Sequence, residues 1–142
     1  GIKLGLANIV VVLSLYLLGT KYALVINLLR IFILSFLFTG PYGLIYSLCG
    51  GLLSFGAMVL LKRTTVFSII GVSVGGSILH NTGQILAAMV LMSTSSLLYY
   101  LPVLIITGTV TGTLIGLISG FLLKKLTPIM EYLHIENTKQ LF

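Results

Sequence analysis

This 142-residue chain is marked first by what it lacks, above all acidic residues. It contains no aspartate and no tryptophan, and its two glutamates, Glu131 and Glu136, both lie near the C-terminal end. Charged residues make up 7% of the chain and hydrophobic residues 58%. Because a soluble domain carries about 25% charged residues, this composition excludes an ordinary soluble protein and indicates a membrane protein.

The shortage of acids also excludes several kinds of chemistry. Before Glu131 the chain offers no carboxylate pair for general acid/base catalysis and no acidic ligand set for Mg²⁺. The two histidines, His80 and His134, lie too far apart in the expected topology to share a metal, and no Walker lysine motif for ATP occurs. The single Cys49 can form no disulfide within the chain. We therefore expect a protein that is not an enzyme and that holds no metal or cofactor.

Apolar runs fill most of the sequence. As helices, they would be about 25 to 40 Å long, against a hydrocarbon core of about 30 Å. The sequence predicts an all-α, polytopic membrane helical bundle with five transmembrane helices in one domain, residues 1–125. Residues 126–142 are expected to form a cytoplasmic tail, either a short interfacial helix or disordered. The five runs extend from Ile2 to Leu18, Tyr22 to Thr39, Tyr42 to Leu61, Val66 to Met92 and about Pro102 to Leu123.

The basic residues, which give a net charge of +6, are distributed unevenly around these runs. Only Lys3 lies on one side of the expected bundle, and the bias toward the other side predicts a cytoplasmic C-terminus. The expected partner of this charge is anionic membrane lipid rather than nucleic acid. Because five spans place the two ends on opposite sides, we expect a sixth helix before Gly1 in the full protein. The residues on the positive side are Lys21, Lys62, Arg63, Lys124, Lys125 and Lys139.

Arg30 is the most informative single residue. It lies well inside the second run, about 12 Å from the end expected to be cytoplasmic. A charge at the bilayer centre costs about 2.5–3.5 kcal/mol on insertion scales, so this side chain should face the protein interior. No acid in any run neutralises it. Two interpretations stay open: a structural arginine that binds backbone carbonyls, or an electrostatic anchor for an anionic ligand.

A second polar group lies in the fourth run. His80 and Gln84 are four residues apart and share a helix face, while Asn81 points elsewhere. Asn8 lies about 9 Å below the outer surface in the first run. These residues could converge on a cavity that opens outward, with Arg30 near its floor, and we interpret them as a substrate-binding site. The alternative is ordinary hydrogen bonding between helices, worth about 0.6 kcal/mol per pair.

Glycines recur every four residues in the last run, at Gly108, Gly112, Gly116 and Gly120. Such ridges let two helix backbones approach closely. Packing within the monomer is the simpler interpretation. Docking of a partner subunit on this ridge is the functional one.

Several strings in the chain resemble a known family, over about Gly1 to Lys125. The similarity is to the Gx transporter family, also described as heptaprenyl diphosphate synthase component I, and through it to the S components of energy-coupling factor (ECF) transporters. S components are six-helix bacterial membrane proteins that capture vitamins or related micronutrients outside the cell. They work with a coupling subunit and two ATPases, so the resemblance implies a missing first helix and such partners. The strings are GIKLGLAN at residues 1–8, Leu28-Leu29-Arg30, Tyr46-Ser47-Leu48 with Gly50-Gly51, and His80-Asn81-Thr82-Gly83-Gln84.

Our leading hypothesis is therefore a substrate-binding subunit of an ECF-type uptake transporter in the bacterial cytoplasmic membrane. The solute would bind from outside, and ATP would be hydrolysed by the partners. The alternative is a non-catalytic membrane subunit or anchor in prenyl diphosphate or quinone biosynthesis or in flavin-dependent electron transfer. Direct catalysis on a prenyl diphosphate fits badly, because such synthases use aspartate-rich motifs. A third option is a stand-alone carrier, which would need a site for a coupling ion.

Overall fold

The computed structural model describes the backbone of residues 2–140 and the side chains of residues 8–133. Apart from short connections, the described part of the chain is helical and has no strand, so the all-α prediction is confirmed. The elements in order are α1 (Ile2–Leu17), α2 (Thr20–Leu34), the π-helical turn η1 (Ser35–Thr39), α3 (Gly40–Arg63), α4 (Ile69–Met92), the 3₁₀ turn η2 (Ser96–Tyr100) and α5 (Leu101–Gln140).

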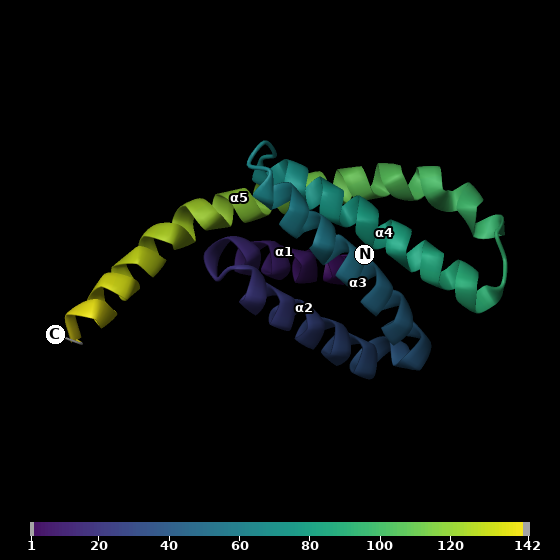
Figure 1. Cartoon of the computed structure of the whole chain (residues 1–142), viewed down its shortest axis with the longest axis horizontal. Coiled ribbons are helices and arrows are strands. Elements are labelled where there is room, and N and C mark those ends of the chain that lie inside the picture. The colour runs from purple at the N-terminus through teal and green to yellow at the C-terminus, as the bar shows by residue number, and fades with distance from the viewer. Residues whose placement is uncertain (1, 141–142) are drawn as a thin grey trace.

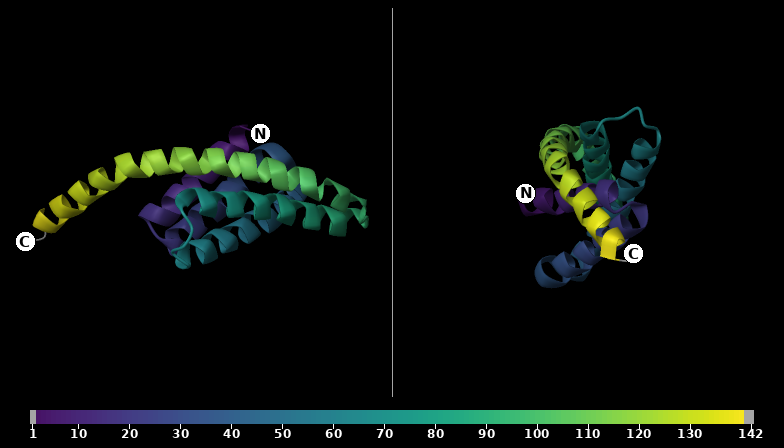
Figure 2. Two further views of the ribbon diagram at one scale, coloured as in Figure 1. Left: turned by 90° about the horizontal axis from the view of Figure 1, so that it is seen from above. Right: turned by 90° about the vertical axis from the view of Figure 1, so that its left-hand side faces the viewer.

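The helices form an irregular bundle in which α4 lies between α3 and α5 (Figures 1 and 2). α1 packs against α2 and α5, and α2 also contacts α3. The turn between α1 and α2 and the loop between α3 and α4 lie toward one end of the bundle (Figure 1). The α2–α3 corner and the α4–α5 connection lie toward the other end, and α5 runs on far past the rest of the bundle.

Two glycines allow the sharpest changes of direction. Gly19, between α1 and α2, has φ 92°, and Gly40, at the start of α3, has φ 68°. Both values lie in the left-handed region that side chains with a Cβ disfavour. At the next connection, Ser68 caps α4 by accepting a hydrogen bond from the backbone N–H of Gly71 at 3.3 Å. These local signals fix short connections, so sequential helices must pack as neighbours.

The apolar core lies where α1, α3, α4 and α5 meet. Val11, Val12 and Leu15 from α1 are almost fully buried there. At the edge of this core Lys62 joins α3 to α1, because its Nζ donates to the backbone oxygen of Leu15 and lies 4.8 Å from the centre of the Tyr16 ring. The other buried core residues are Ile9, Ala23, Phe55, Met58, Val72 and Ile115.

The expectation of five membrane-spanning helices is wrong. Within the described residues, two helical segments are long and apolar enough to cross a membrane: Thr20–Arg63, of 44 residues, and Ser96–Leu133, of 38 residues. The second and third expected spans are not separate segments, because η1 joins α2 to α3 without a non-helical residue. The described apolar part of α1, Asn8–Leu17, is too short. α4, of 24 residues, is not among the segments that meet this criterion.

The part of the chain expected to form a tail continues α5. The helix runs through Pro128 to Gln140, and the Thr127 hydroxyl donates to the Leu123 carbonyl at 2.7 Å across the expected boundary. The side chains of Lys3 and Lys139, used in the charge argument, lie outside the described residues. Whether this segment sits at the membrane interface stays a prediction of the sequence.

Candidate functional site

Arg30 lies about one turn before the end of α2 and is bound by two neutral amides. Its Nη1 donates to Oδ1 of Asn8 at 2.6 Å, and its Nη2 donates to Oδ1 of Asn27 at 3.0 Å. Its Nε is buried and has no partner among the described residues. The arginine therefore joins α1 to α2, two helices that the sequence analysis had connected only through an expected cavity.

Asn27 completes this cluster, although the sequence analysis did not select it. It is 1% exposed, and its Nδ2 donates to the backbone oxygen of Gly51 on α3 at 3.2 Å. Asn27 precedes Arg30 by three residues, so the two share a helix face. That spacing was the signal that could have found it. The Asn8–Arg30–Asn27–Gly51 chain of hydrogen bonds thus connects α1, α2 and α3.

His80 lies on α4 against α3 and is only 8% exposed. A methyl group added to Gly50 would lie 2.7 Å from the backbone oxygen of His80 and 3.3 Å from its Nδ1, so the glycine is what lets the helices approach here. The Nδ1 atom has no hydrogen-bond partner within the described part of the chain.

Asn81 and Gln84 line an open pocket of about 320 Å³ near the α4–α5 connection. Nδ2 of Asn81 donates to the backbone oxygen of Leu104 on α5 at 3.1 Å, which fixes the amide in the pocket wall. Tyr46 of α3 adds a phenol, and Leu97 of η2 adds part of an apolar wall. The remaining lining residues are Ile85, Ala88 and Leu104. A pocket with a few polar groups on apolar walls is the usual form of a small-molecule site.

The structure therefore places four of the five predicted site residues in two separate pairs and leaves His80 outside both. Arg30 and Asn8 bond to each other between α1 and α2, whereas Asn81 and Gln84 share a pocket. His80 is buried against α3. The sequence analysis missed Tyr46 as a lining residue, although Tyr46-Ser47-Leu48 was among the strings that carried the family resemblance.

The glycine ridge of α5 lies against α4 for most of its length. A methyl group added to Gly112 would be 2.6 Å from Cα of Val74, and one added to Gly116 would be 2.6 Å from Cα of Ile70. At Gly108 the nearest atom would be Cα of Ile78, at 3.1 Å. These approaches are backbone to backbone, so at Gly112 and Gly116 a side chain would force the helices to shift, whereas at Gly108 the fit is tight. At Gly120 nothing lies within 4 Å, so of the four glycines only this one leaves room.

A second, almost wholly apolar groove of about 610 Å³ runs between α3 and α4. Cys49, the single cysteine, is exposed and lines it. Its other lining residues are Ile45, Leu52, Leu53, Gly83, Leu86, Ala87, Val90 and Leu91. Among the described residues no group of three or more His, Cys, Asp or Glu is placed to hold a metal ion.

Comparison with known proteins gives a family. The family model for heptaprenyl diphosphate synthase component I matches residues 1–122, which cover α1 to α4 and the first half of α5. A search of curated proteins found no significant match. A search of solved structures found none either. The match and the two long apolar helical segments identify the chain as a membrane protein that belongs to the heptaprenyl diphosphate synthase component I family.

Proposed function

We propose that this protein is the membrane-embedded, substrate-binding subunit of an ECF-type micronutrient uptake transporter. The proposal is supported chiefly by the pocket that Asn81, Gln84 and Tyr46 line between α3, α4 and α5. Its size, about 320 Å³, is at the lower end of the range for small-molecule sites. Amide groups at this position would form hydrogen bonds with a neutral or anionic solute.

The place of this pocket in the bundle fits binding from outside. Leu97, which lines the pocket, lies in the α4–α5 connection at one end of the bundle. The α1–α2 turn, which precedes Lys21, and the α3–α4 loop, which follows Arg63, lie at the other end (Figure 1). Since positive residues gather on the cytoplasmic side of membrane proteins, we place the pocket end outside and the C-terminal end of α5 inside. The chain itself would hydrolyse no ATP, and a coupling subunit with two ATPases would do this work.

The hydrogen bonds of Arg30 decide which residues are assigned to solute binding. Two of its nitrogen atoms already bind Asn8 and Asn27, which favours the structural interpretation of this arginine. The solute-binding role is therefore assigned first to Asn81 and Gln84. Arg30 and His80 are assigned a structural role in helix packing.

A retained small molecule is the direct test. Native mass spectrometry of protein released gently from the membrane should show a bound mass below that of a lipid. Gln84→Leu keeps the volume of the side chain but removes its amide, so this variant should lose the mass. Leu86→Ala, on the same helix but outside this pocket, should keep it. Equal retention by both variants would exclude this pocket as the binding site.

The family description supports a second candidate, a non-catalytic membrane subunit associated with prenyl diphosphate synthesis. The apolar groove between α3 and α4 favours it, because its walls suit an isoprenoid chain. Co-purification separates the two candidates. Recovery with ATPases and a coupling subunit supports uptake, whereas recovery with a soluble prenyl synthase supports the anchor.

A further inference from the structure

The far end of α5 extends beyond the bundle and is left uncovered by it (Figures 1 and 2). The apolar segment Ser96–Leu133 begins in η2, and α5 supplies it from Leu101 onward. At 1.5 Å per residue, Leu101–Leu133 is about 50 Å of helix, against a hydrocarbon core of about 30 Å. One end of this segment must therefore leave the hydrocarbon. The paired cations Lys124 and Lys125, both exposed, mark where it does so.

Beyond these lysines the helix still carries apolar side chains on its outer side. Ile129 is 55% exposed and Leu133 49% exposed, and their spacing of four residues places them on one face. In water these exposed aliphatic side chains would contact no apolar partner. We call Ile129 and Leu133 the outer face of the α5 extension.

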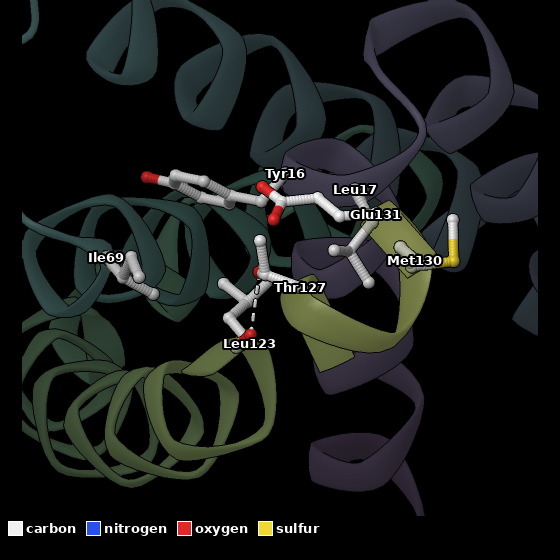
Figure 3. Close-up of a pocket in the computed structure, with 7 residues that line it drawn as sticks. All are labelled: Tyr16, Leu17, Ile69, Leu123, Thr127, Met130 and Glu131. Carbon is white, nitrogen blue, oxygen red and sulfur yellow. Dashed lines mark hydrogen bonds between the residues drawn. The ribbon is translucent and has the colours of Figure 1, made fainter. Parts of the chain in front are cut away.

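The opposite side of the extension faces the bundle. Thr127, Met130 and Glu131 line a cavity of about 680 Å³ together with Tyr16 and Leu17 of α1 (Figure 3). Glu131 is therefore turned toward the bundle, away from the outer face. The extension is thus two-sided: Thr127, Met130 and Glu131 lie toward the cavity, and Ile129 and Leu133 lie on the other side.

The lysine charges and the curvature of α5 both fit an extension that lies on a membrane surface better than one in free solution. Nζ of Lys125 lies 4.7 Å from the centre of the Phe121 ring, so its long stem follows the helix and its charge lies near the point of exit. Pro128 has no backbone N–H and removes one helical hydrogen bond, which bends helices. α5 is indeed curved, so its far end leaves the direction of the membrane-crossing part (Figure 2).

We propose that the α5 extension binds an anionic lipid surface, with Ile129 and Leu133 inserted among the lipids and Lys124 and Lys125 against the phosphate groups. Amphipathic helices with basic residues bind membranes in this way, through apolar burial and attraction to anionic lipid. The continuity of the extension with a membrane-crossing helix holds it at the required depth. This surface is separate from the solute pocket and does not depend on its role.

Site-directed spin labels on the whole protein test this. Single cysteines would replace Ile129, Leu133 and Glu131 in a Cys49→Ala background, and the labelled proteins would be placed in vesicles with and without phosphatidylglycerol. Collision with oxygen reports lipid, and collision with a water-soluble nickel complex reports water. With anionic lipid, the labels at 129 and 133 should favour oxygen several-fold, and the label at 131 should favour nickel.

Three results would overturn the proposal. Nickel access at all three positions would place the extension in water. Exclusion of both reagents at 129 and 133 would mean that a second copy or another protein covers the outer face. Unchanged oxygen access in purely neutral vesicles, or after Lys124→Gln with Lys125→Gln, would remove the role of anionic lipid.

Discussion

Where α5 crosses α4, the two backbones touch through glycines, whereas α2 is held to α1 and α3 through Arg30 and Asn27. At the first contact Gly112 lies so close to Val74 that a single methyl group would not fit. At the second, hydrogen bonds between polar groups add to apolar packing, in which the Ile31 side chain lies against Gly51. We therefore expect an added methyl group to weaken the α4–α5 contact and the loss of a polar group to weaken the contacts of α2 with α1 and α3.

The difference follows from how helices associate in an apolar surrounding. Apolar side chains gain little there by leaving lipid, so close packing of small residues and hydrogen bonds between polar groups supply the attraction. A buried charge must also be satisfied within the protein. The α4–α5 contact uses mainly the first device, with one added hydrogen bond from Asn81 to Leu104. The contacts of α2 with α1 and α3 add the second device to apolar packing. Substitutions that add or remove atoms at each contact therefore separate the two.

The largest effect is expected for Asn27→Ala. This change removes the acceptor for Nη2 of Arg30 and leaves a buried charge with one hydrogen bond fewer, which should destabilise the protein by about 3 kcal/mol. Arg30→Met removes the charge itself, keeps most of the volume and should cost less. The free energy of unfolding in mixed micelles measures both. If Arg30→Met destabilised the protein more than Asn27→Ala, an unsatisfied buried charge would not be the cause of the loss of stability.

A smaller effect, about 2 kcal/mol, is expected for Gly112→Ala. The added methyl group would lie 2.6 Å from Cα of Val74 and 2.9 Å from the backbone oxygen of Ser73, so α4 and α5 must separate. Gly120→Ala on the same helix meets nothing within 4 Å. It should be neutral or stabilise by up to about 1 kcal/mol, because alanine favours helix over glycine. Equal losses of stability for both variants in the same unfolding assay would show that close packing against α4 does not distinguish Gly112 from Gly120.

The smallest effect on stability, about 0.6 kcal/mol, is expected for Asn81→Ala. This change removes one hydrogen bond between helices, from Asn81 to the Leu104 carbonyl. Thr109→Ala provides the control, since the Thr109 hydroxyl bonds only within its own helix, to the Ile105 carbonyl. Retention of a small molecule should fall much more than stability in the Asn81 variant. A stability loss as large as that of Asn27→Ala would instead make Asn81 a structural residue.

The helical character of the chain could be predicted from the sequence, but the number of membrane-crossing segments could not. Runs of apolar residues mark helices, and each expected run lies mainly within a described helix. The number of crossings depends on continuity: the chain changes direction at Gly40, but η1 keeps the second and third runs in one helical segment.

The candidate site was predicted as a set of residues but not as an arrangement. Arg30 and Asn8 were selected by their depth and type, and the structure pairs them. Which helices face each other is set by close glycine contacts, such as Gly50 with His80, and spacing within one run contains no such information. For that reason the sequence analysis placed one cavity where the structure has a hydrogen-bonded corner and a separate pocket. The binding role of these residues stays a prediction.

The unbroken length of α5 has a mechanical consequence. Leu104 of this helix lines the pocket at one end of the molecule, and Thr127 lines the cavity at the other. The helix between them is about 35 Å long. A rod of this kind works as a lever, and a tilt of about 10° at one end would displace the other by about 6 Å over that length. If the pocket binds a solute outside the membrane, as proposed, a tilt of α5 would carry the signal of occupancy to the cytoplasmic side without any relay of side chains.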